Sequence, residues 1–105
     1  MKTTVQILTE ARALIDTPEK WTQGTYARCG AFSCPTHSPA ATCFCSLGAL
    51  SRASDQKSSS NLAIYFLELS TGMQSLSEFN DHHSHAEVMG LFDRAISLAK
   101  LEEEK

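Results

Sequence analysis

The fold is decided by residues 79–101, which read FNDHHSHAEVMGLFDRAISLAKL. Ser84 and Glu87 are spaced as in a capping box, in which each side chain bonds the backbone N–H of the other residue at the start of a helix. The apolar side chains behind this box recur with the helical period, and their arc is wide enough to need cover on more than one side. They are Val88, Met89, Leu91, Phe92, Ala95, Ile96, Leu98, Ala99 and Leu101. The stretch predicts a long C-terminal helix around which the chain packs, and we interpret Gly90 as a point where a neighbouring element comes close.

Two more helices are predicted upstream. Residues 4–16 place apolar side chains on one face, and Pro18 ends this helix because the residue before a proline avoids the helical region. Residues 45–53 also have helical spacing, and the pair Gly48-Ala49 offers a small surface for close packing. Both segments are expected to pack against the C-terminal helix.

A further helix is predicted after a polar loop at residues 54–60. Ser60 is its expected cap, and Gly72 is expected to end it in the left-handed conformation. Its apolar stripe has the spacing i, i+3, i+4 and i+7, which predicts a core-facing side. That stripe consists of Leu62, Tyr65, Phe66 and Leu69.

The middle of the chain, residues 22–45, has a different character. Its two ends favour strands, and Gly, Pro, Ser and Thr fill the part between them. We therefore predict a small two-stranded β-ribbon with a long loop at 22–45, including a Cys/His/Pro insert at 29–41. The predicted fold is mainly α (α+β), a single domain over 1–105 with about four helices packed around the C-terminal one.

Composition narrows the functional classes. The chain has 105 residues, a net charge of −3 and nine scattered Lys and Arg, so no nucleic-acid surface is predicted. No apolar stretch is as long as a membrane span. The first residues lead into an amphipathic helix rather than a signal peptide, so we expect a cytoplasmic protein. In a reducing compartment the four cysteines are expected to be free thiols or metal ligands rather than disulfides.

The insert raises the question of a zinc site. Zinc prefers four tetrahedral thiolate or imidazole ligands, with neighbouring pairs separated by two to four residues. Cys43 and Cys45 are separated by one residue, which on a strand sends their thiols to opposite faces. No cofactor is therefore expected, and zinc is kept as the alternative. Its candidate ligands are Cys29, Cys34, His37, Cys43 and Cys45.

A second candidate is a Cys-dependent active site. A nucleophilic cysteine needs a histidine within hydrogen-bond reach and a third group that orients the ring. Cys45 stands where a helix begins, which is expected to lower its pKa, and His85 with Asn80 or Asp81 supplies the other groups. Nothing in the sequence brings residues 45 and 85 together, so no enzyme is predicted. The neighbouring histidines at 82–85 are interpreted as surface residues, with metal or anion binding as the alternative.

Three separated segments resemble those of an uncharacterised small domain family of unknown function, found in actinobacteria, phages and prophages. The segments are Trp-x-Gln-Gly at 21–24, Cys-x-Leu-Gly-Ala-Leu at 45–50, and an aromatic-Asn-Asp turn at 79–81 followed by Ala-Glu-Val at 86–88. This chain departs from the family in having Phe79 where Trp is usual and in its Cys- and His-rich insert. The resemblance implies a fold and a phage-like context, and it implies no reaction.

The resemblance singles out polar and aromatic positions that form either a structural turn or a ligand site. They are Trp21, Gln23, Asn80, Asp81 and His85. We predict a small non-enzymatic binding protein, an accessory protein of a phage or mobile element that acts on a host protein or a small ligand. A homo-oligomer would fit this hypothesis. The alternative is a zinc-binding or Cys/His-dependent protein built on residues 29–45.

Overall fold

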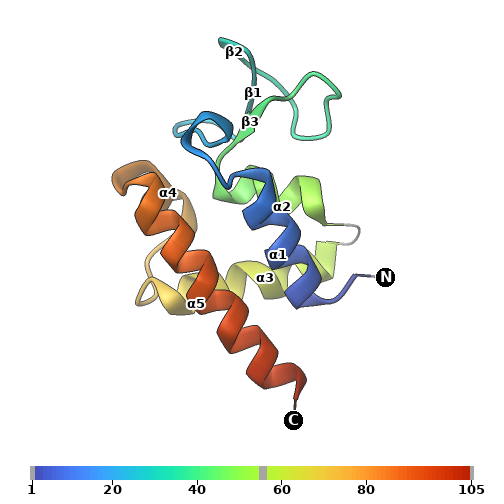
Figure 1. Ribbon diagram of the computed structural model, residues 1–105, viewed down its shortest axis with the longest axis vertical. Coiled ribbons are helices and arrows are strands. Elements are labelled where there is room, and N and C mark those ends of the chain that lie inside the picture. Colours follow the sequence, from blue (N-terminus) through green and yellow to red (C-terminus); the bar gives the residue numbers. More distant parts are fainter. Residues whose placement is uncertain (1, 55–56, 105) are drawn as a thin grey trace.

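The part of the chain that the structure describes forms five α-helices and a small sheet (Figure 1). The structure is a computed structural model that describes residues 2–54 and 57–104, without the side chains of residues 57–60. Part of the predicted loop at 54–60 therefore lies outside the described residues. The helices are α1 (Thr4–Leu14), α2 (Ser46–Ala53), α3 (Lys57–Ser70), α4 (Leu76–His82) and α5 (His85–Glu103), with a 3-10 turn η1 (Pro18–Lys20). The mainly α fold with a small sheet is as predicted.

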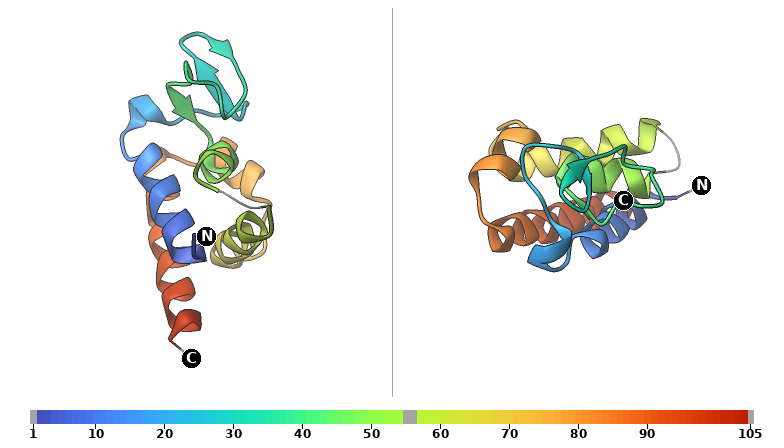
Figure 2. Two further views of the ribbon diagram at one scale, coloured as in Figure 1. Left: turned by 90° about the vertical axis from the view of Figure 1, so that its right-hand side faces the viewer. Right: turned by 90° about the horizontal axis from the view of Figure 1, so that it is seen from above.

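The C-terminal helix α5 starts at the predicted capping box. The Ser84 N–H donates to Glu87 Oε1 at 2.9 Å, and the Glu87 N–H donates to Ser84 Oγ at 3.2 Å. Helices α1 and α3 pack against its buried side (Figure 2). That side consists of Val88, Met89, Leu91, Phe92, Ala95 and Ala99. The prediction that this helix organises the core is confirmed.

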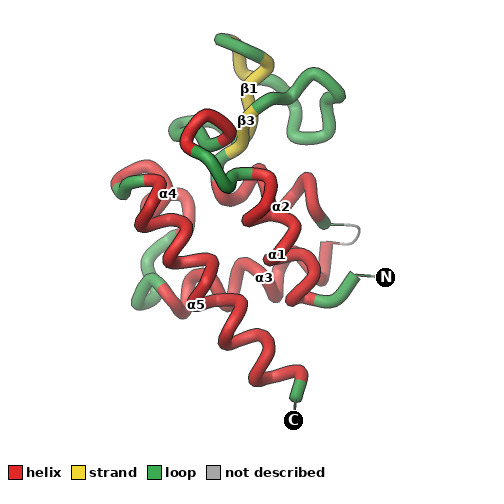
Figure 3. The backbone as a smooth tube through the Cα atoms, viewed as in Figure 1, coloured by secondary structure: helices red, strands yellow, loops and turns green. Residues whose placement is uncertain are grey.

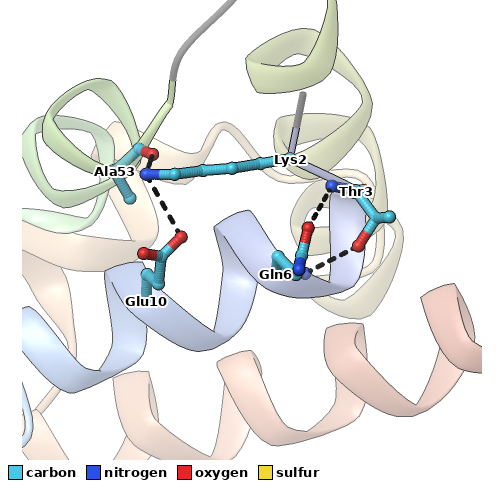
Figure 4. A network of polar contacts seen from close by, with 5 residues as sticks. All are labelled: Lys2, Thr3, Gln6, Glu10 and Ala53. Carbon is cyan, nitrogen blue, oxygen red and sulfur yellow. Dashed lines mark hydrogen bonds and ion pairs between the residues drawn. The ribbon is translucent and has the colours of Figure 1, made fainter.

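A second capping box, formed by the motif Thr-x-x-Gln at residues 3–6, begins α1. The Gln6 N–H donates to Thr3 Oγ1, and the Thr3 N–H donates to Gln6 Oε1 at 2.7 Å (Figure 4). Beside it, Lys2 Nζ donates to the Ala53 carbonyl at 2.7 Å and lies 3.3 Å from Glu10 Oε2. The ammonium group thus meets the negative end of α2, where a cation is stabilising, and ties the start of α1 to the end of α2.

The sheet has three strands, one more than the predicted ribbon. The strands β1 (Ala27–Cys29), β2 (Phe32–Ser33) and β3 (Cys43–Phe44) run antiparallel in the order β2-β1-β3. The additional strand β2 lies inside the segment expected to be a loop, because a disulfide between Cys29 and Cys34 closes the β1–β2 hairpin. Figure 3 shows how short the strands are within the long connections, at the end of the molecule opposite the C-terminus.

Helix α3 differs most from its prediction. It begins at Lys57 rather than after Ser60, so the proposed Ser60 cap is wrong. It buries Ala63 and Leu67, whereas three side chains of the expected core stripe are largely exposed. A helix that is apolar on more than one side can dock by either, and the small Ala63 side chain lets α3 pack closely on the core. Gly72, at φ 79°, ends the helix as predicted.

Helix α4 occupies a segment that was expected to be a connection. The residues Phe79-Asn80-Asp81 were interpreted as a turn because Asn and Asp favour turns. They form the last turn of α4 instead, with Leu76 and Phe79 buried. The first N–H of α4, that of Leu76, donates to the Glu68 carboxylate at 3.0 Å. This cap comes from the preceding helix, and the side chain of Ser75, the N-cap residue of α4, makes no capping bond.

Candidate functional site

Asn80 is the centre of a buried polar cluster that joins three distant parts of the chain. Its side chain is 1% exposed. Asn80 Oδ1 accepts from Trp21 Nε1 at 2.8 Å, from the Ser46 N–H at 3.0 Å and from Ser46 Oγ at 2.7 Å. Asn80 Nδ2 donates to the Thr22 carbonyl at 3.0 Å. These bonds fix the segment after η1 and the start of α2 against α4.

Two more residues tie the loop at 21–24 to α4. Gln23 Nε2 donates to the Asn80 carbonyl at 2.9 Å and to the His83 carbonyl at 3.2 Å, which lie at the end of α4. Asp81 Oδ1 accepts from the Gly24 N–H at 3.0 Å. We call the whole cluster the polar junction; it consists of Trp21, Thr22, Gln23, Ser46, Asn80 and Asp81.

The polar junction forms one wall of a cleft of about 370 Å³. The carboxylate of Asp81 is exposed, and no hydrogen bond to its second oxygen, Oδ2, forms within the described residues. The other wall comes from the chain before β1 and includes Tyr26, which is 60% exposed. The cleft is lined by Gly24, Thr25, Tyr26, Cys45, Ser77, Asn80 and Asp81.

In this cleft, Cys45 caps the N-terminus of α2. It is the N-cap of α2, and its Sγ accepts from the Gly48 N–H at 3.3 Å. Burial raises the pKa of the Cys45 thiol, an effect that the N–H groups of α2 only partly offset. The expectation that the helix start would lower this pKa is therefore wrong, because the loss of solvent outweighs the helix terminus. Cys45 is a neutral thiol at pH 7.

His85 lies beside the junction, where it contacts Ile15 and Trp21. Its Nε2 donates to the Ile15 carbonyl at 2.7 Å, and its ring meets the Trp21 ring edge-on at 5.7 Å. No hydrogen bond joins His85 to Cys45 anywhere in residues 2–54 and 57–104. His83 is also held, through a bond from Nδ1 to the Phe79 carbonyl at 2.9 Å. The structure thus does not assemble the nucleophile and base considered above.

The Cys/His insert divides its five zinc candidates. Cys29 and Cys34 are joined in a disulfide, which corrects the expectation of free thiols, while Cys43 and Cys45 are buried and free. His37 is exposed on a loop. Within the described part of the chain, no three His, Cys, Asp or Glu side chains are grouped as metal ligands. A zinc site that used Cys29 or Cys34 would require these two residues to be reduced.

A second surface feature lies on the far side of the core. The expected stripe of α3 faces outward and meets two leucines of α5 across a groove of about 680 Å³. We call this surface the apolar face; it consists of Leu62, Tyr65, Phe66, Leu69, Leu98 and Leu101. The prediction that these side chains belong to the core is wrong for most of them. Phe66 alone among them is partly buried.

Sequence reasoning named most of the polar junction and missed two members. Trp21, Gln23, Asn80 and Asp81 are brought together, and His85 lies next to Trp21. Ser46 was missed, because a serine beside a cysteine at a helix start carries no signal for a partner 34 residues away. Thr22 contributes only its carbonyl, which any residue type would supply.

Comparison with known proteins yields one match. Residues 1–98 match a family model described as a family of unknown function, DUF6197. Neither a curated protein nor a solved structure matches the chain. Among the described residues, none of the helices has the length and apolar character that a bilayer crossing requires.

Proposed function

Since the chain belongs to the family of unknown function DUF6197, we propose a function from the geometry of the cleft: a small non-enzymatic binding protein for a small ligand. The observation that carries this proposal is the Asp81 carboxylate at the cleft. Two donors, the Gly24 N–H and Asn80 Nδ2, hold its Oδ1 at 3.0 and 3.3 Å. A carboxylate fixed in this way keeps its second oxygen available for a ligand.

The chemistry of the cleft indicates the class of ligand. Asp81 offers a negative charge, and Tyr26 and Ser77 offer exposed side chains with hydroxyl groups. A charge-assisted hydrogen bond to a carboxylate is about twice as strong as a neutral one. The ligand that fits is a small organic cation, such as an amine or a guanidinium compound, with an apolar part that lies against the Tyr26 ring.

Binding is proposed in place of catalysis because of the state of the candidate groups. The Cys45 thiol has its pKa raised by burial and accepts a capping bond. The Nε2 of His85 is used by the Ile15 carbonyl. A neutral thiol without a base is a poor nucleophile. The cleft therefore has a charge that can hold a ligand and lacks a group that would attack one.

The biological setting remains that of the sequence resemblance. We propose an accessory protein of a phage or mobile element that works in the cytoplasm of a bacterial host and sequesters a small ligand. The host protein considered as an alternative target would have to bind at a surface other than the polar junction. The polar junction offers little for that purpose, because most of its side chains are already bonded to one another.

The test is a titration of ¹⁵N-labelled protein with a set of small cations: arginine, agmatine, spermidine and choline. We expect at least one to saturate and to shift the signals of the Gly24 amide, the Trp21 indole and the Asn80 side chain. Asp81→Asn keeps an oxygen for the Gly24 N–H and removes the charge, so it should weaken binding about tenfold or more. Glu19→Gln removes the same charge outside the cleft and should leave the affinity unchanged.

Two results contradict the proposal. One is the absence of any saturating shift around the cleft at millimolar concentrations of all four compounds. The other is equal affinity of the wild type and Asp81→Asn, which would show that the cations bind through the general negative charge of the protein.

A further inference from the structure

The apolar face keeps large hydrophobic side chains exposed to solvent. Leu62 and Tyr65 are each 53% exposed, Leu69 is 39% exposed, and Leu98 and Leu101 are 37% and 59% exposed. The largest apolar patch on a typical monomer covers about 300–600 Å² and often has a function, so a patch made of five exposed large side chains is a candidate interaction surface. The patch is continuous, because all five line the same groove between α3 and α5.

The placement of α5 makes this surface accessible to a large partner. The C-terminal end of α5 extends beyond the other helices and forms one extremity of the molecule (Figure 1; Figure 2, left). Leu98 and Leu101 lie in the last two turns of α5. A partner helix can therefore lie along the end of α5 without meeting the sheet, which is at the opposite end.

Charged residues at the two ends of the face indicate which partner fits. Arg94, Leu98, Leu101 and Glu102 have the spacing i, i+4, i+7 and i+8, which places them on one side of α5. The Arg94 guanidinium extends back over Gly90 on that side, since a Cβ added to Gly90 would lie 3.8 Å from it. Glu102 and Glu104 line the other end of the groove. The face thus carries a positive charge at one end and negative charges at the other.

This charge pattern is complementary to itself. Leu98 lies midway in sequence between Arg94 and Glu102, with four residues on either side. Two α5 helices that cross antiparallel at Leu98 would place Arg94 of each copy opposite Glu102 of the other. Two-fold contacts use the same surface on both molecules, and such self-complementary interfaces are the commonest in soluble oligomers. A parallel approach would set the acidic ends against each other.

We infer that the apolar face is the interface of a homodimer, in which the α5 helices of two copies cross antiparallel around Leu98. The leucines and Tyr65 form the dry centre, and the Arg94 and Glu102 pairs form the charged rim. In such interfaces the buried centre supplies most of the affinity and the charged rim selects orientation. This inference is independent of the ligand proposed for the cleft.

The test is sedimentation equilibrium of the full chain over a wide range of concentrations. The wild type should dimerise reversibly, and intact mass spectrometry should show no intermolecular disulfide. Leu98→Asp places a charge at the two-fold axis and should weaken dimerisation about 100-fold or more. Met73→Asp changes an exposed apolar residue outside the face (69% exposed) and should leave the dimer unchanged.

A charge exchange tests the antiparallel arrangement. Arg94→Glu should weaken the dimer about tenfold, because both symmetry-related pairs become repulsive. Adding Glu102→Arg to that variant should restore the wild-type dissociation constant, with circular dichroism confirming that each variant is folded. A monomer at millimolar concentration, or a dimer indifferent to Leu98→Asp, would overturn the inference and leave the apolar face to a different protein. A double variant as weak as Arg94→Glu alone would overturn the antiparallel arrangement.

Discussion

The polar junction and the apolar face lie on different helices and differ in how far one chain satisfies them: the junction joins residues 21–24, α2 and α4, and the face lies on α3 and α5. In the polar junction, residues from three segments satisfy one another, and within the described residues no buried side-chain polar atom lacks a partner. On the apolar face, large side chains of α3 and α5 are exposed to solvent, although a different apolar side of each helix is buried. The contrast teaches that the junction is satisfied within one chain, apart from Asp81, whereas the face is the surface that we propose a second copy covers.

The largest expected effect comes from Asn80→Ala in the junction. The change leaves the Trp21 indole N–H and both Ser46 donors without their shared acceptor. Each orphaned buried group costs about 1–3 kcal/mol, so we expect a loss of roughly 3–5 kcal/mol in the free energy of unfolding, measured by urea denaturation. Asn61→Ala, at an exposed position on α3, should change the stability by less than about 0.5 kcal/mol. Equal, small effects of both substitutions would contradict the view that the junction holds the three segments together.

Gly48 and Gly90 provide the next test. A Cβ at Gly48 would overlap the backbone carbonyl of Tyr26, because α2 packs directly on the chain before β1, whereas a Cβ at Gly90 would meet only ordinary contact distances. The interpretation of Gly90 as a point of close approach is therefore wrong, and Gly48 has that role. We expect Gly48→Ala to lower the free energy of unfolding by about 3 kcal/mol.

Gly90→Ala should raise the free energy of unfolding by about 0.5–1 kcal/mol, because alanine favours the helix interior. Both glycine variants can be compared by the same urea denaturation. If Gly90→Ala destabilised the chain as much as Gly48→Ala, the packing assigned to α2 and α5 would be wrong.

The smallest expected effect concerns Cys45 and alkaline pH. Burial raises the pKa of this thiol in the folded chain, so above the ordinary thiol value of about 8.5 the unfolded chain loses a proton that the folded chain keeps. The contribution to stability is therefore constant at lower pH and declines as the pH rises past that value. Cys45→Ser retains a capping oxygen and should flatten the alkaline decline in urea denaturation between about pH 8 and 10. Cys43→Ser is the matched control and should retain the alkaline decline in stability. If the decline were the same in both variants, it would come from groups other than Cys45.

Local signals predicted much of the fold. The capping box of Ser84 and Glu87, the left-handed Gly72 and the close-packing surface at Gly48 depend on neighbouring residues, and the structure contains all three. The exposed side of α3 could not be predicted in this way. Its two apolar sides have similar periodicity, and the choice between them depends on how Ala63 fits against helices that are distant in sequence.

The sequence indicated which residues belong to the polar junction, but it did not indicate how they bond to one another. Their motifs drew attention to Trp21, Gln23, Asn80 and Asp81, but Asn80 was interpreted as a turn former, while the structure uses it as a buried acceptor within α4. Hydrogen bonds between residues more than 30 positions apart produce no repeating pattern in the sequence from which they could be predicted. The disulfide was missed for a different reason, since the expected compartment argued against it.

The most direct test of the division between the two regions is a dilution series followed by ¹⁵N NMR of the ligand-free protein. The amide signals of the C-terminal half of α5 and of the outward side of α3 should shift with concentration, while the Trp21 indole and Asn80 side-chain signals stay in place. Shifts that appear at the polar junction on dilution, or an apolar face whose signals are the same at micromolar and millimolar concentration, would contradict the account.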